Sequence, residues 1–141
     1  MSHESTTLSF IIPEPFEKAI KLIRQVLREE ELKIPMELNV SRRLRRELGI
    51  GLGECKVLCV DCPASVLEAM AVDRSAGLLL PLHVVVSGRN QWTQVHLPNP
   101  ASIQGNSLAI GAKVSVSKLL ARVTQALERV ATREVFSQLA V

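Results

Sequence analysis

Two apolar runs interrupted by prolines constrain the fold of this chain more than any other feature. The first run, Lys56–Val60, leads into a helical segment that opens on a proline, Pro63–Asp73, and Gly77 is the expected stop of that helix. The second run, Leu79–Ser87, is broken by Pro81. Short apolar runs bounded by proline and glycine are typical of buried strands, so this segment predicts two core strands joined by a helix.

Alternating patterns predict three further strands. Apolar and polar residues alternate over Thr7–Ile12 and over Ile34–Val40, which is typical of half-buried strands. Pro35 cannot donate a backbone hydrogen bond, so it favours an edge position for the second of them. A strand over Gln91–Leu97 follows Gly88-Arg89-Asn90, which predicts a hairpin with the preceding strand.

Helices are predicted in the gaps between these strands. The first helix begins at Pro15, because a missing N–H costs nothing in the first turn, and a short one runs over Arg42–Leu48 with Ser41 as its cap. Ser115 or Ser117 is the expected cap of the last helix. The stretch Pro98–Ala112 is predicted to be a loop, and the tail Val135–Val141 is expected to pack on a partner subunit or to fray.

The order of these elements predicts the fold class. Long helices flank five strands, and the central hairpin and the alternating second strand argue against a fully parallel, doubly wound sheet. We therefore expect an α+β protein, a two-layer sandwich with a largely antiparallel five-stranded sheet and helices packed on one face. With 141 residues, the chain fits a single domain spanning residues 1–141.

Composition narrows the classes of function. The net charge is only +3, and three Phe and one Trp, with no Tyr, leave few aromatic platforms for stacking bases. Nucleic acid is therefore not the expected partner. No apolar run approaches the roughly 20 residues of a membrane span, so no membrane partner is expected. Three cysteines cannot all pair within one chain, and the polar start of the sequence lacks an apolar signal segment, so we expect a cytoplasmic protein with free thiols.

Two motifs resemble cofactor sites, but the residues around each motif do not fit such a site. Cys55, Cys59 and Cys62 have the C-x3-C-x2-C spacing of an iron–sulfur site. On a strand, however, Cys55 and Cys59 lie about 13 Å apart, because each residue advances about 3.3 Å, so they cannot share one metal ion. The glycines of Gly49–Gly53 are followed by Glu54 and Cys55, whereas a phosphate-binding loop ends in Lys and Ser or Thr. No cofactor is expected.

The remaining candidates are polar residues near the two core strands. Asp61 and Cys62 fall where the first run stops, and His83 follows the proline break of the second. If the two strands are neighbours, these side chains converge at one edge of the sheet, where cysteine and histidine suit an activated thiolate or a metal. A half-buried or exposed His83 beside an inert Cys62 is the alternative. A second candidate is an anion-binding cluster in one short helix, formed by Arg42, Arg43, Arg45 and Arg46, whose alternative reading is a solvated helix face.

The segment from Cys55 to Pro100 resembles the bacterial and archaeal family called domain of unknown function 302. That family has a Cys-Asn-Pro-like turn, a helix, then Gly-x-Leu-Leu-Pro-Cys and a run of valines. The matching residues are Asp61-Cys62-Pro63, Gly77-Leu78-Leu79-Leu80-Pro81 with Val84-Val85-Val86, and Pro98-Asn99-Pro100. Aligned on the prolines, the two family cysteines fall at Asp61 and Leu82, and their asparagines at Cys62 and His83. Neither family cysteine is therefore present in register.

The resemblance implies a compact sandwich and frequent homodimers, and it implies no established activity. We therefore expect a non-enzymatic binding or regulatory module that acts as a homodimer and contacts a small ligand or a protein. The alternative is a thiol- or metal-dependent activity at Asp61, Cys62 and His83. A weaker alternative is nucleic-acid or anion binding through the arginines of residues 42–46.

Overall fold

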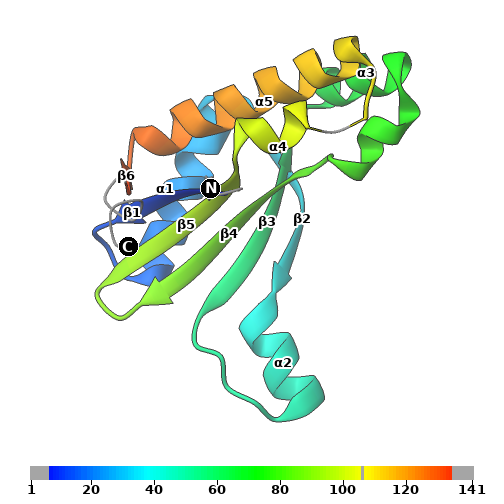
Figure 1. Ribbon diagram of the computed structural model, residues 1–141. Helices are drawn as coiled ribbons and strands as arrows, with labels where there is room; N and C mark the ends of the chain where they lie inside the picture. Colours follow the sequence, from blue (N-terminus) through cyan, green and yellow to red (C-terminus); the bar gives the residue numbers. More distant parts are fainter. Residues whose placement is uncertain (1–6, 106, 135–141) are drawn as a thin grey trace, which may run out of the picture.

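The computed structural model describes residues 7–105 and 107–134, so the predicted role of the tail at 135–141 lies outside the described residues. Strands and helices are interspersed along the chain (Figure 1). The strands are β1 (Thr7–Ile12), β2 (Lys33–Asn39), β3 (Cys55–Asp61), β4 (Leu82–Arg89), β5 (Trp92–Pro98) and β6 (Thr132–Arg133). The helices are α1 (Phe16–Glu29), α2 (Val40–Leu48), α3 (Pro63–Val72), the 3-10 helix η1 (Arg74–Leu78), α4 (Pro100–Gln104) and α5 (Ile110–Glu128).

The strands form one sheet in the order β2-β3-β4-β5-β1-β6, and every neighbouring pair is antiparallel. The predicted antiparallel α+β sheet is thus confirmed, with the two-residue β6 as a sixth strand. β2 lies at one edge, as Pro35 requires. The β4–β5 hairpin turns after the pair Arg89 and Trp92, with Asn90 at a left-handed φ of 69°. Its turn therefore lies slightly later than the sequence predicts.

The core fills the space between one face of the sheet and the helices. Side chains alternate along each strand, so Phe10, Leu58 and Val84 share that face, and all three are fully buried. Ile23 and Leu27 of α1 and several residues of α5 meet them. Gly88 of β4 lets α1 approach closely, because a Cβ there would lie 3.3 Å from that of Phe16. Figure 1 shows α2 apart from the other helices, at the far end of β2 and β3.

The boundaries of α2 and α3 differ from the sequence-based expectation. α2 begins at Val40, two residues earlier than expected, because the side chain of Asn39, and not that of Ser41, accepts the capping hydrogen bond from the Arg42 N–H. Ser41 instead accepts a hydrogen bond from the Cys55 N–H, which joins α2 to the start of β3. α3 ends at Val72, and Gly77 lies within η1, whose first turn is capped by Asp73.

The predicted loop Pro98–Ala112 is wrong, because it contains α4 and the first turn of α5. Asn99 caps α4, and Pro100 occupies its first position, where no N–H is needed. Neither Ser115 nor Ser117 caps α5, which starts at Ile110 behind Ala109 without a side-chain cap. Ser115 is buried inside that helix and donates to the Gly111 carbonyl. Among the described residues, no helix is both long and apolar enough to cross a membrane.

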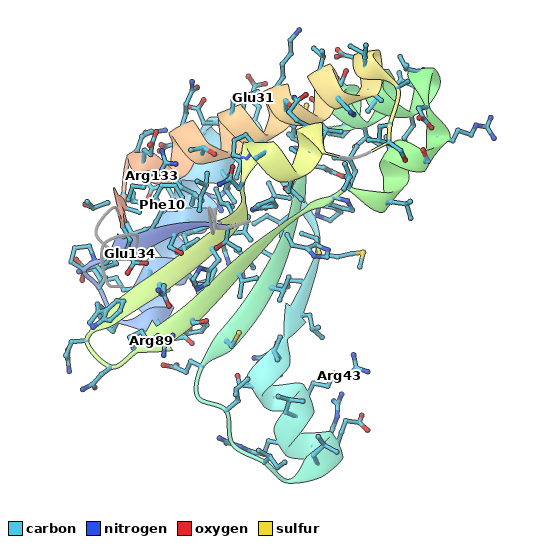
Figure 2. All side chains as sticks on the ribbon, in the orientation of Figure 1. Phe10, Glu31, Arg43, Arg89, Arg133 and Glu134 are labelled. Carbon is cyan, nitrogen blue, oxygen red and sulfur yellow. The ribbon has the colours of Figure 1, made fainter. Side chains whose placement is uncertain are left out.

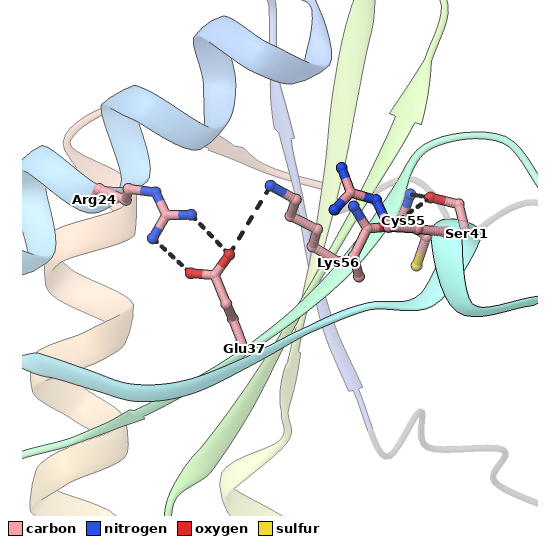
Figure 3. Close-up of polar contacts among 7 residues, drawn as sticks. Arg24, Glu37, Ser41, Cys55 and Lys56 are labelled. Atoms are coloured by element: carbon pink, nitrogen blue, oxygen red, sulfur yellow. Dashed lines mark hydrogen bonds and ion pairs between the residues drawn. The ribbon is translucent and has the colours of Figure 1, made fainter. Parts of the chain in front are cut away.

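A polar clasp fastens α1 to the edge of the sheet (Figure 3). The Arg24 guanidinium donates two hydrogen bonds to the Glu37 carboxylate, at 2.7 and 2.9 Å, and Lys56 Nζ lies 3.9 Å from the same group. The hydrogen bonds from Arg24 hold the pKa of Glu37 below its usual value, against the opposing effect of burial. The two-point geometry fixes the orientation of β2 under the helix.

Replacing Glu37 by glutamine tests this clasp. We expect Glu37→Gln to lower the free energy of unfolding by about 0.5–1 kcal/mol at pH 7, because the pair is partly exposed. The folded pKa of Glu37 is lowered, so its stabilisation is complete above the unfolded value near 4.3 and disappears as pH falls through the folded value. Urea unfolding at pH 7 and pH 3 measures this. Glu68→Gln, on an exposed part of α3, is the matched control, and equal losses in both variants would contradict the assignment.

Candidate functional site

The predicted site residues lie where β3 ends, beside β4. β3 and β4 are neighbours, with Cys59 opposite His83 and Val60 opposite Leu82. Asp61 therefore shares a face with Cys59 and His83, the face turned away from α1 and α5, which we call the open face. Asp61 and His83 are diagonal neighbours, a relation that places such residues roughly 7–8 Å apart. The register thus brings Asp61 and His83 to one corner of the sheet.

Cys62 points to the other side of the sheet. It lies one residue beyond Asp61, at the N-cap of α3, and packs against the hydrophobic core. The N–H of Ser65, then the guanidinium of Arg122 from α5, then the N–H of Ala64 hold the pKa of the Cys62 thiol below its ordinary value, although burial opposes them. The surroundings of Cys62 thus stabilise its thiolate form. Helix N-termini and nearby cations have this effect on thiols in general.

The structure separates the three candidates instead of joining them in one cluster. Within residues 7–105 and 107–134, no group of three His, Cys, Asp or Glu side chains could hold a metal ion. His83 is exposed and lines a hollow of about 320 Å³ with Pro81, Ser102 and Ile103, among other residues. Asp61 lines a different hollow. The geometry therefore supports separate roles for Asp61 and Cys62, and it places His83 near Asp61 but in a different hollow.

The hollow beside Asp61 has the character of a binding site for an apolar ligand. Its volume is about 580 Å³, larger than the hollow at His83. It lies between the start of β2, the end of β3 and α3, and its walls are mainly apolar, formed by Pro35, Pro63, Val66, Leu67 and Met70, with Lys33 at the rim. Such a hollow with one placed polar group is typical of small-ligand sites.

Asp61 is the polar group that faces this hollow. Burial raises the pKa of its carboxyl group, with no opposing contribution from a nearby cation or donor. Among the described residues its carboxylate has no side-chain hydrogen bond or ion pair, even though Lys33 lies opposite it in the β2–β3 register. A half-buried carboxylate without a partner is costly to keep ionised, and a donor brought by a ligand would offset this cost.

The arginine cluster lies far from this hollow, on α2. Arg42 and Arg45 line a smaller hollow of about 260 Å³ under that helix, together with Asn39 and Glu54. Arg46 lies 3.9 Å from its neighbour Glu47, and Figure 2 shows Arg43 on the outside of α2. Because Glu54 adds a negative charge to the hollow, the cluster there is not a simple anion site.

The cysteines are divided between the two sides of the sheet, and two glycines shape the α2–β3 connection. The three cysteines are free thiols, with Cys55 and Cys59 on the open face and Cys62 on the opposite side. Gly49 and Gly53 have left-handed φ values of 70° and 83°, which explains glycine at both ends of the α2–β3 connection.

Arg122 is the residue that sequence reasoning missed. It lies in the middle of α5, sixty residues after Cys62, and in the linear pattern it is one of several basic residues on the polar side of that helix. Its guanidinium also donates to the Glu30 carbonyl at 2.7 Å, so it is anchored to the end of α1 while it faces the thiol. Only the packing of α5 on α3 reveals this contact, and no local signal could have found it.

Comparison with known proteins agrees with the likeness seen in the sequence. The model of the family described as domain of unknown function DUF302 matches residues 8–132. The crystal structure of an uncharacterised conserved DUF302 protein from Bacillus stearothermophilus superposes with a TM-score of 0.81 at 18% sequence identity, covering 90% of this chain and 99% of that one. No curated protein matches. The shared fold and the family match over most of the chain show that this chain belongs to the DUF302 family.

Proposed function

We propose that this protein is a non-enzymatic, homodimeric binding module whose ligand occupies the hollow beside Asp61. The observation that carries the proposal is the half-buried carboxylate of Asp61, which has no side-chain partner in the described chain and faces an apolar cavity of about 580 Å³. The free state thus retains an electrostatic cost that a ligand can remove. A mostly apolar hollow with few polar groups suits the binding of a small ligand.

The ligand class follows from the walls of the hollow. Five apolar or proline residues line the hollow together with Asp61 and Lys33, and Asp61 is the half-buried group that lacks a side-chain partner. The fitting ligand is therefore small and mostly apolar, and it carries one positively charged or hydrogen-bond-donating group for Asp61. An amine at the end of an aliphatic chain meets this description, whereas a carboxylate of the same length would face the charge of Asp61. Pairing with an amine lowers the pKa of Asp61, so binding strengthens as pH rises through the raised pKa of the free protein.

A titration with matched aliphatic probes tests this proposal. We expect n-hexylamine to shift the backbone amide resonances of Asp61, Val66 and Leu67 in ¹H–¹⁵N spectra at pH 7, with little effect from n-hexanoate. Asp61→Asn removes the charge at constant size and should weaken amine binding by about tenfold, which corresponds to roughly 1.4 kcal/mol. Equal shifts for both probes, or an Asp61→Asn variant that binds hexylamine as the native chain does, would contradict the assignment.

The cellular location is part of the same proposal. We place the protein in the cytoplasm, because all three cysteines are free thiols and such thiols persist in reducing compartments.

Thiol-dependent activity at Cys62 is the second candidate function, and one specific observation favours it. The N–H groups of Ser65 and Ala64 at the start of α3 and the Arg122 guanidinium lower the pKa of the Cys62 thiol. By contrast, burial raises the pKa of the Cys59 thiol. A stabilised thiolate is the reactive form of cysteine, so Cys62 is the thiol of this chain suited to exchange with a disulfide or to reaction with an electrophile.

The pH dependence of alkylation distinguishes this candidate from an inert cysteine. In a Cys55→Ser/Cys59→Ala background, we expect iodoacetamide to modify Cys62 with a midpoint below the usual thiol pKa of about 8.5. Arg122→Met keeps the length of the side chain, removes its charge and should move that midpoint upward. Circular dichroism checks the folding of each variant. A midpoint at or above the ordinary value, or one that Arg122→Met leaves unchanged, would rule out activation of Cys62.

A further inference from the structure

The open face of the sheet carries an apolar patch bordered by polar residues. On β1 and β5 the outward residues are mixed: Ser9 and His96 form a hydrogen bond of 2.9 Å, and Ile11 and Trp92 lie on the same face. On β2, β3 and β4 five neighbouring outward residues are apolar or cysteine, and Asp61, His83 and Ser87 lie beyond them on the same strands. We call these five the outer patch: Met36, Leu38, Val57, Cys59 and Val85. An antiparallel sheet that faces water normally places polar residues outward, so the outer patch has the pattern of a covered surface.

The register shows that the outer patch is continuous. Leu38 lies opposite Val57, which lies opposite Val85, so three strands contribute to one apolar row. Met36 lies opposite Cys59 in the next row on the same face. Met36 and Leu38 keep 63% and 41% of their surface exposed, although their neighbours in the rows are half-buried or buried. The described part of the chain places no helix over these rows.

A second uncovered apolar surface lies next to this patch. We call residues 40–54, which comprise α2 and its connection to β3, the arm. No residue of α2 is buried, and Leu48, Ile50 and Leu52 are 64%, 56% and 56% exposed. An isolated helix of nine residues is marginal in water, so packing of an apolar side is what usually stabilises one. Figures 1 and 2 show the arm extending beyond the ends of β2 and β3, away from the helical layer.

We propose that two copies of this chain associate with the arm of each copy lying on the outer patch of the other. A two-fold axis makes this contact reciprocal, so each uncovered surface of one copy meets the complementary surface of its partner. The inference rests on the proposed homodimer and assigns its interface. The five side chains Met36, Leu38, Leu48, Ile50 and Leu52 expose about 500 Å² in each copy, and two copies together reach the roughly 1,000 Å² that a specific interface needs.

Charge favours this arrangement over direct packing of one arm on another. α2 carries four arginines and one glutamate, so two arms in contact would bring two strongly positive helices together. The outer patch contains no charged residue, and each arm on the partner's patch keeps its arginines at the solvated rim. The outer patch of a second copy therefore covers the apolar side chains of the arm without bringing two positively charged helices together.

Sedimentation velocity over a concentration series tests the assignment with three variants. Leu48→Ser/Ile50→Ser alters the arm, and Leu38→Lys alters the outer patch. Leu78→Ser/Ile110→Ser changes two other exposed aliphatic residues, at 85% and 80% exposure, and is the matched control. We expect the native chain and the control to be dimeric and the arm and patch variants to dissociate with a Kd raised at least tenfold, while circular dichroism shows intact folding. If the double arm variant unfolds, Ile50→Ser alone, in the connection after α2, replaces it.

Mixing the arm variant with the patch variant adds a result that only a reciprocal contact predicts. The mixture should form heterodimers more tightly than either variant forms homodimers, because one of its two half-contacts joins an intact arm to an intact patch. A native dimer that neither variant weakens would overturn this interface and leave the homodimer itself in place. A native chain that stays monomeric at high concentration would overturn both, and the hexylamine titration reports on the ligand site independently.

Discussion

The alternation of side chains across one antiparallel sheet is the constraint on which the rest of this structure depends. Each strand turns every second residue toward α1 and α5, and these residues, such as Phe10, Leu58 and Val84, form a core in which the major side chains are fully buried. The clasp of Arg24 and Glu37 then ties the helical layer to the edge strand. Because the helices cover one face only, the nature of the other face depends entirely on the remaining residues of each strand.

The same alternation explains the chemistry at the end of β3. Asp61 and Cys62 are adjacent in sequence, yet one faces an apolar hollow and the other faces the start of α3 and Arg122. Their pKa values shift in opposite directions for different reasons, burial for the carboxyl group and donors for the thiol. Two sites of distinct character therefore lie one residue apart, and a substitution at one can leave the environment of the other intact.

Periodic signals in the sequence predicted most of the fold, and contacts between distant residues account for what was missed. The alternating pattern of Thr7–Ile12 and the apolar run before Pro63 were sufficient to predict β1 and β3. Each pattern arises within its own segment, because it reflects which side chains of that strand face the core. The N-caps of α2 and α5, Asn39 and Ala109, were missed because a nearby serine was taken as the cap in each case. A serine near a helix start is a weak signal, since in α2 a neighbouring residue makes the cap and in α5 no side chain does. The contact of Arg122 with Cys62 and the outer patch of the open face exist only after the strands and helices have packed.

The central claim is that the second copy of this chain completes the apolar surface that one copy leaves uncovered. An isotope-filtered NOE experiment on a mixture of ¹³C-labelled and unlabelled protein tests it most directly, since it detects only contacts between copies. The account predicts cross-peaks between the methyl groups of Leu48 and Ile50 in one copy and those of Val57 and Val85 in the other. A dimer whose intermolecular cross-peaks involve neither the arm nor the outer patch would contradict it.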